Sequence, residues 1–263
     1  MITKCSNADL DRIHQYIGNE YSSCLYLYMD LIQYGPDSNF TSSWIQEEKG
    51  RILCVILSYH TAMHIYARES FNTHEVIDLI TNIKPSQICA TKSTLFALKD
   101  TLSTIGYDLE LGFVGKLGYF GQSQPQGIVK ATINDVDDIS KLLYSDQGIG
   151  ASYTLEDLKE QFRERLSQGF VRSYIIKQND RIVAHLGTGA EIGNVCIITY
   201  VITDKEYRGR GFAKMLYQAA CKDLRDEGKE VYAVYYTNSA IQLHHSVGFK
   251  DCCQYGKLFL KTH

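Results

Sequence analysis

The spacing of apolar positions changes several times along the second half of the chain, and each change predicts a different element. Residues 195–202 form a β-branched, mostly apolar run, which is typical of a strand buried on both faces. From Gly211 the apolar positions fall at helical spacing until about Gly228. The elements predicted after residue 127 are a strand at 128–133, helices from 135 and 154, strands at 173–177, 181–186 and 195–202, a helix from 211, a strand at 231–237, a helix at 240–246, and a terminal strand pair from Phe249 around Gly256.

The first half predicts a similar order of elements. These are helices at 7–16 and 21–33, strands at 41–47, 51–58 and 63–67, a helix at 73–82, a strand at 87–90, a helix at 93–101 and a strand at 109–119. The two series favour a duplicated α/β (α+β) fold, in which helices flank a mixed, mostly antiparallel central sheet. The small, uncharged stretch 121–127 contains a helix-breaking Pro125 and predicts a linker between a domain at 1–120 and a domain at 128–263.

Composition narrows the class of protein. The 263 residues are 44% hydrophobic and 22% charged, as in globular proteins, and the net charge of −3 offers no polybasic surface for nucleic acid or an acidic membrane. No apolar run approaches the length that spans a bilayer, and the N-terminus lacks the apolar core of a signal peptide. The eight cysteines form no C-x-x-C pair, which indicates reduced thiols and a cytoplasmic location. We expect no metal site, because the adjacent pair His244-His245 would splay apart on a helix.

The most informative segment joins the strand ending near residue 203 to the helix beginning near Gly211. Gly209 and Gly211 can adopt positive φ and let an anion approach the main chain, and the free N–H groups of the helix N-terminus would face it. Arg208 and Arg210 add positive charge. The alternative interpretation is an ordinary strand-to-helix turn with solvated arginines. The pattern is not a dinucleotide fingerprint, because no third glycine follows Gly211 at the required spacing.

Two motifs together resemble a known family. The segment Arg208-x-x-Gly211-x-Ala213, preceded by Tyr200-Val201 at the end of a strand, resembles the acetyl-CoA signature of the GNAT superfamily of N-acetyltransferases. Downstream, residues 238–249 run from an Asn through a helix to Gly-Phe, and are similar to the second cofactor segment of that superfamily. The resemblance covers about residues 128–261, and the predicted strand order agrees with it.

The resemblance implies an enzyme, an acyltransferase that moves an acetyl group from acetyl-CoA, or an acyl group from another acyl-CoA, to a primary amine by direct attack. The residues implied to bind the cofactor are Tyr200, Val201, Thr203, Arg208, Gly209, Arg210, Gly211, Phe212, Ala213 and Asn238. No protein nucleophile is needed, because the substrate supplies the attacking amine.

The acid and base are less well defined. Many members of the superfamily have a Tyr at the position of His244, so His244 is the candidate general acid; the alternative is a helix histidine with no role. Many also have a Glu on the central strand where this chain has Ile197. Glu191 and His185 on neighbouring strands are weaker candidates for the base.

The first half lacks the glycines of the anion-binding loop, so we expect it to bind no coenzyme A. The acceptor predicted for the enzyme is a small-molecule amine, with a monomer or homodimer as the assembly. The alternatives are transfer of a longer acyl group to an amino acid, acetylation of a protein amine, and a cofactor-binding sensor or scaffold without catalysis.

Overall fold

The computed structural model describes residues 1–118, 125–146, 154–167, 169 and 171–260. Most of the predicted linker, 121–127, therefore lies outside the described residues. Of the described residues, none belongs to a helix long and apolar enough to cross a membrane.

The chain forms two compact units that are not continuous in sequence. Unit 1 contains Met1–Gly115, Val234–Ile241 and the segment from Asp251 onward, and unit 2 contains Lys116–Ala233 and Gln242–Lys250. The sequence predicts two continuous domains, whereas the structure assigns two late segments to the first unit. The reason lies in strand pairing, because β12 (Phe249–Leu260) pairs antiparallel with β5 (Gln87–Thr91). Leu258 of β12 is fully buried in the core of unit 1.

The first series of elements confirms the predicted order and adds one short strand, β1. Its members are β1 (Ile2–Lys4), η1 (Asn7–Asp9), α1 (Leu10–Ile17), η2 (Tyr21–Ser23), α2 (Leu25–Tyr34), β2 (Thr41–Glu48), β3 (Arg51–Tyr59), β4 (Ala62–Ala67), α3 (Thr73–Ile83), β5, α4 (Lys92–Ser103) and β6 (Tyr107–Leu117). The sheet of unit 1 has the strand order β1-β2-β3-β4-β5-β12-β6.

The second series repeats the order of the first. It comprises β7 (Ile128–Lys130), η3 (Ile133–Asp135), α5 (Val136–Tyr144), α7 (Leu155–Ser167), β8 (Ser173–Gln178), β9 (Arg181–Ile192), β10 (Val195–Thr203), η4 (Lys205–Tyr207), α8 (Phe212–Asp226), β11 (Glu230–Tyr235), α9 (Asn238–Ser246) and β12. The sheet of unit 2 has the order β11-β10-β9-β8-β7. Each series contains a parallel pair, β4 with β5 and β10 with β11, beside antiparallel neighbours. This is the mixed, mostly antiparallel sheet that the sequence predicts.

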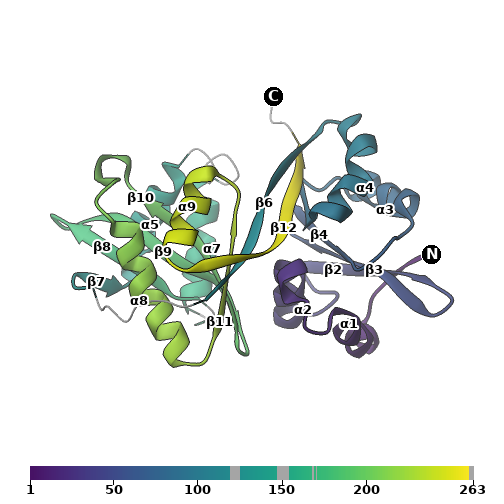
Figure 1. The fold of residues 1–263 in the computed structure, drawn as a ribbon, viewed down its shortest axis with the longest axis horizontal. Coiled ribbons are helices and arrows are strands. Elements are labelled where there is room, and N and C mark those ends of the chain that lie inside the picture. The colour runs from purple at the N-terminus through teal and green to yellow at the C-terminus, as the bar shows by residue number, and fades with distance from the viewer. Residues whose placement is uncertain (119–124, 147–153, 168, 170, 261–263) are drawn as a thin grey trace. The chain divides into compact units, whose positions relative to one another are not determined.

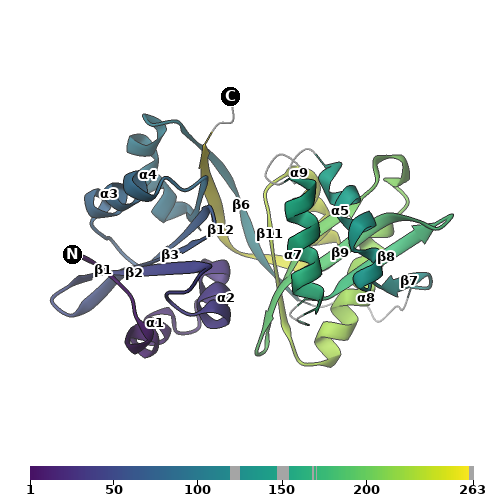
Figure 2. The ribbon, with the colours of Figure 1, turned by 180° about the vertical axis from the view of Figure 1, so that it is seen from behind.

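Helices cover both faces of each sheet. In unit 1, α1 and α2 lie on one face and α3 and α4 on the other (Figure 1). Strand β3 shows why, since Val55 and Leu57 pack into the core on the α1–α2 side, while Cys54 and Ile56 belong to the core on the α3–α4 side. In unit 2, α5 and α7 cover the face seen in Figure 2, and apolar side chains of both helices pack against β8, β9 and β10.

One predicted element is wrong. The segment from Phe249 is a single strand that runs through Gly256, and not a strand pair that turns there. Gly256 serves a different purpose, because a Cβ at this position would lie 2.5 Å from the carbonyl oxygen of Glu110 and 2.9 Å from Leu111. A glycine inside a strand therefore marks a close approach of the neighbouring backbone, β6.

Candidate functional site

Strand β10 is irregular at its C-terminal end. Its pairing with β9 shifts register between Thr199 and Ile202, and Tyr200, at the shift, has a positive φ of 51°. Parallel pairing with β11 runs from Val195 opposite Glu230 to Ile198 opposite Ala233, and β10 then continues to Thr203. A bulge of this kind interrupts the hydrogen-bond ladder and redirects main-chain groups. Tyr200, Val201 and Thr203, which the sequence analysis singled out, all follow Ile198, the last residue of β10 paired with β11.

The loop after β10 leads into an uncapped helix N-terminus. Gly211 is the N-cap of α8, has a φ of 79° and provides no side-chain cap, and the first turn of α8 contains no acidic residue. Gly209 has a φ of 78°, and a Cβ at either glycine would meet no atom within 4 Å. The first N–H groups of a helix have no partner within the helix, and the dipole makes this end positive. The loop therefore has the geometry of an anion-binding site, with Phe212 and Ala213 in the first turn of the helix.

The two arginines of this loop hold its conformation. Arg208 Nε donates to the carbonyl oxygen of Thr203 at 3.1 Å, and Arg210 Nη2 donates to the carbonyl oxygen of Glu206 at 3.3 Å. The Arg210 guanidinium also lies 4.8 Å from the ring centroid of Tyr207. The Arg208 and Arg210 side chains thus close the loop on itself while bringing positive charge to it.

Asn238 is not assigned to the same unit as the other predicted cofactor-binding residues. It is the exposed first residue of α9 and belongs to unit 1, whereas residues 200–213 belong to unit 2.

The candidate general acid, His244, is buried in unit 2. It is 6% exposed, its Nε2 lies 2.6 Å from the hydroxyl oxygen of Tyr217, and its ring packs edge-on against Phe249. Sequence reasoning did not find Tyr217 as its partner, because nothing local links position 217 to position 244.

The base candidate Glu191 is held in an ion-pair cluster. Arg172 donates to it from Nε at 2.9 Å and from Nη2 at 2.7 Å, and the hydroxyl of Thr188 donates at 3.0 Å. Lys229 Nζ lies 3.7 Å away, and the Glu191 side chain is only 9% exposed. Its oxygens therefore accept from several donors within unit 2.

The other base candidate, His185, is fully buried beside the bulge. Its Nδ1 lies 2.9 Å from the carbonyl oxygen of Tyr200, and its Nε2 lies 3.1 Å from the hydroxyl oxygen of Ser173. Burial lowers the pKa of His185 to about 4. Ser173 was not singled out from the sequence, but Gly187 and Gly189 offered a signal, because two glycines inside one strand predict a close approach. A Cβ at Gly187 would lie 3.1 Å from the His185 ring.

The equivalent strand-to-helix connection in unit 1 differs in the feature that matters. The N-cap of α3 is Asn72, whose side chain accepts from the main-chain N–H groups of His74 and Glu75 at 3.2 and 3.4 Å. Glu75 also places an acid in the first turn. The N-terminus of α3 is therefore already capped and has an acidic residue in its first turn, unlike that of α8.

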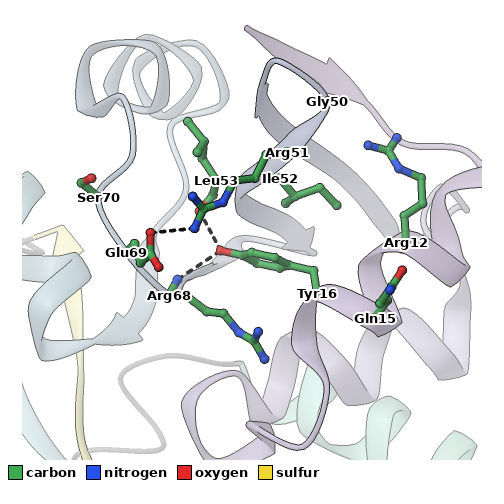
Figure 3. Close-up of a pocket in the computed structure, with 10 residues that line it drawn as sticks. All are labelled: Arg12, Gln15, Tyr16, Gly50, Arg51, Ile52, Leu53, Arg68, Glu69 and Ser70. Atoms are coloured by element: carbon green, nitrogen blue, oxygen red, sulfur yellow. Dashed lines mark hydrogen bonds and ion pairs between the residues drawn. The ribbon is translucent and has the colours of Figure 1, made fainter.

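The same connection borders a pocket of about 310 Å³ in unit 1 (Figure 3). The hydroxyl of Tyr16 donates to the carbonyl oxygen of Leu53 at 2.7 Å and accepts from the main-chain N–H of Arg68 at 3.1 Å. Glu69 forms an ion pair with Arg51 at 2.7 Å. The main-chain N–H of Arg68 and the guanidinium of Arg51, which could otherwise bind an anion, thus have partners within the protein.

Comparison with known proteins links part of the chain to a family. Residues 136–249 match the model of the acetyltransferase (GNAT) family. No protein with a curated description matches the sequence.

Several solved structures share the fold over nearly the whole chain. A GCN5-related N-acetyltransferase from Sphaerobacter thermophilus is 16% identical, with a TM-score of 0.66 over 98% of this chain and 94% of that one. A GNAT-family acetyltransferase from Colwellia psychrerythraea is 11% identical, with a TM-score of 0.64 over 99% and 100%. A tandem GNAT protein from the clavulanic acid biosynthesis pathway is 10% identical, with a TM-score of 0.61 over 98% and 97%. At such identities the likeness concerns the fold, and it extends through both units. Residues 136–249 thus match the acetyltransferase (GNAT) family, and the chain as a whole shares the fold of these GNAT structures.

Proposed function

We propose that the protein is an acetyl-CoA-dependent N-acetyltransferase that acetylates the primary amine of a small molecule. The observation that carries this proposal is the uncapped N-terminus of α8 at Gly211, at the end of the connection that follows the bulged end of β10. An acyl-CoA has two features that fit these elements: a pyrophosphate, which suits a glycine-rich helix N-terminus, and an amide-containing pantetheine arm, which suits a strand edge. When bound, it supplies an acyl group activated as a thioester.

In this proposal the main-chain N–H groups from Gly209 to Ala213 hold the pyrophosphate. Arg208 and Arg210 contribute positive charge while their side chains keep the loop closed. The main-chain groups of Tyr200, Val201 and Thr203 orient the pantetheine arm along the edge of β10. Asn238 stays a predicted contact. Because the Thr203 carbonyl already accepts from Arg208, its N–H is the group more readily used.

The two units differ in whether the helix after the strand-to-helix connection has a side-chain cap. Asn72 accepts hydrogen bonds from the first N–H groups of α3, and Glu75 places a negative charge in its first turn. We therefore propose that unit 1 binds no coenzyme A. One cofactor per chain then follows. The absence of nucleic-acid and membrane partners, the cytoplasmic location and the monomeric or homodimeric assembly stay predictions from the sequence.

The test is calorimetric titration with acetyl-CoA of the wild type and of Gly211→Asp. Nothing lies within 4 Å of a Cβ at Gly211, so the variant should fold, at a cost of about 1 kcal/mol for a side chain at positive φ. A carboxylate about 4 Å from a pyrophosphate charge is repelled by roughly 1 kcal/mol in water and roughly 4 kcal/mol near a protein surface. We expect one site per chain in the wild type, and binding weakened by about 30-fold or more in the variant.

Two control variants separate charge from shape. Gly211→Asn has nearly the same size as the Asp variant without its charge, and should lose less affinity. Gly50→Asp makes the same change at a glycine of φ 78° with equally open surroundings in unit 1, and should bind as the wild type does. Unchanged affinity in a folded Gly211→Asp protein would exclude this loop as the cofactor site.

A second candidate function is a sensor or scaffold that binds acyl-CoA without catalysis. The observation that favours it is the engagement of all three predicted acid and base residues, since His185 and Glu191 have specific protein partners and His244 is buried against Tyr217. Release of coenzyme A thiol in the presence of a panel of small amines separates the two functions. Amine-dependent release supports the enzyme, and tight binding without release supports the sensor. The acyl chain length is tested in the same assay, because a longer acyl-CoA that reacts with amino acids would favour the other acyltransferase activity.

A further inference from the structure

A side chain of the neighbouring strand β9 contacts the bulge of β10. His185 of β9 is 0% exposed, and its Nδ1 lies 2.9 Å from the carbonyl oxygen of Tyr200, the residue with positive φ. A carbonyl oxygen can only accept, so Nδ1 carries the proton. The neutral ring then accepts at Nε2 from the hydroxyl of Ser173, 3.1 Å away. Both ring nitrogens therefore have defined and complementary partners.

The surrounding residues fix the ring in this position. Gly187, two residues along β9, leaves space for it, because a Cβ there would lie 3.1 Å from the ring carbon Cε1 and 3.5 Å from Nε2. Phe162 of α7 packs against both rings, because its ring centroid lies 5.6 Å from that of His185 and 5.4 Å from that of Tyr200. The histidine, the bulge and the aromatic ring thus form one packed group within unit 2.

This group has a reason to exist, because a positive φ is unfavourable for a residue with a side chain. Tyr200 adopts it without being a glycine, so its surroundings must stabilise the conformation. A hydrogen bond from the fully buried His185 to the Tyr200 carbonyl is a direct way to do so, because it gives that carbonyl a partner in the bulged conformation. Without the bond, the strand could return toward regular pairing and turn the main-chain groups of residues 200 and 201 away from their present direction.

We propose that His185 is a positioning residue, which holds the β10 bulge through the Tyr200 carbonyl and so presents the strand edge used by the acyl-CoA. This inference rests on the proposed function, because it assigns the edge to the cofactor. It also replaces the role of base that the sequence suggested for His185. A base needs a nitrogen that can take a proton from substrate, whereas both nitrogens here are buried and in use.

The test compares His185→Leu, which removes the donor, with His185→Asn, whose amide can still donate to the Tyr200 carbonyl. Acetyl-CoA affinity is measured by calorimetry, and kcat and KM by thiol release with a reactive amine. We expect His185→Leu to weaken acetyl-CoA binding by about tenfold and to lower kcat, while His185→Asn recovers most of both. A side chain that merely supported the fold would lower the melting temperature in both variants and leave the affinity of the folded protein unchanged, which would overturn the proposal.

The pH profile separates positioning from base catalysis. If His185 only positions the strand, the profile of kcat/KM should have the same shape in the wild type and in His185→Asn. Loss of an acid limb in the Asn variant would identify His185 as the base and refute the positioning role.

A spectroscopic measurement serves if His185→Leu does not fold. Nitrogen-15 NMR of the wild type should show a neutral imidazole with a slowly exchanging proton on Nδ1, and Ser173→Ala should shift the Nε2 resonance alone. A proton on Nε2 instead would overturn the proposal. The Gly211→Asp variant distinguishes the two levels of inference. If it binds acetyl-CoA normally, the proposed function fails; if it loses binding while folded His185→Leu keeps full affinity, only the role of His185 fails.

Discussion

Gly189 offers a sharp test of how β9 supports the bulged part of β10. The pairing of the two strands shifts register between Ile197, opposite Ala190, and Ile198, opposite Thr188, so Gly189 is the extra residue of a bulge in β9. A Cβ at this position would lie 2.6 Å from Cγ2 of Thr199 and 3.1 Å from its Oγ1. Gly189→Ala therefore pushes directly on the residue before Tyr200.

The magnitude follows from the distances. Carbon atoms in contact prefer a separation of about 3.5–4.0 Å, so the new methyl group is about 1 Å too close to Cγ2. Both atoms are carried by paired strands, which can move apart only by stretching the ladder. Overpacking of this kind costs about 1–3 kcal/mol, and we expect about 2 kcal/mol for Gly189→Ala. Acetyl-CoA affinity should fall as well, because Thr199 cannot move without moving Tyr200.

The matched variant is Thr199→Ser, which removes the colliding methyl group and keeps the hydroxyl. In a double-mutant cycle, Gly189→Ala should be destabilising in the wild-type background and much less so in the Thr199→Ser background, with a coupling of about 1–2 kcal/mol. Urea unfolding followed by far-ultraviolet circular dichroism is the appropriate assay, since the single tryptophan, Trp44, lies in unit 1 and reports on the other part of the chain. Additive effects within about 0.3 kcal/mol would refute the collision as the cause.

Two further predictions concern capping and protonation. Asn72→Ala removes the side-chain cap of α3 and should lower the free energy of unfolding by about 1 kcal/mol in urea titrations while leaving acetyl-CoA affinity unchanged; weaker binding would show that α3 belongs to the cofactor site. Burial lowers the pKa of both His64 and His185 from 6.5 to about 4, so the unfolded chain binds more protons between these values, and their contribution to stability is complete above pH 6.5 and is lost as the pH falls toward 4. The urea concentration at the unfolding midpoint should therefore decrease as the pH is lowered from 6.5 to 5. In His64→Leu it should decrease less steeply, because this variant lacks a buried histidine whose Nδ1 has no hydrogen-bond partner in the structure. Equal slopes in the two proteins would contradict this assignment.

The elements were predictable from the sequence because their signals are local. Residues 195–202 and the helical spacing after Gly211 contain their own periodicity, and the structure places β10 and α8 there. The backbone geometry of the loop after β10 was predictable for the same reason, since Gly209 and Gly211 act through their own φ angles and the adjoining helix end.

The acid and base candidates depended on information that no local pattern contains. The sequence shows at position 185 a histidine that could act as a base. Its burial and its hydrogen bonds to Ser173 and Tyr200 arise only when β8, β9 and β10 pair in the fold. In the same way, the sequence does not show that Glu191 forms an ion pair with Arg172, which lies 19 residues earlier in the chain. A single strand through Gly256 was missed because a glycine that permits close approach and a glycine that turns the chain look alike in sequence.

The membership of β12 in unit 1 has a consequence for how the protein is made. The core of that unit contains Tyr107 near the end of the first series and Leu258 near the C-terminus, about 150 residues later. At roughly 5–20 residues per second, a ribosome needs on the order of 10–30 s to synthesise the intervening chain. During that interval β5 can pair with β4 but lacks β12, so its other edge is open. The core of unit 1 is therefore completed only after β12 has been made, so the two units cannot fold strictly one after the other as the chain is synthesised.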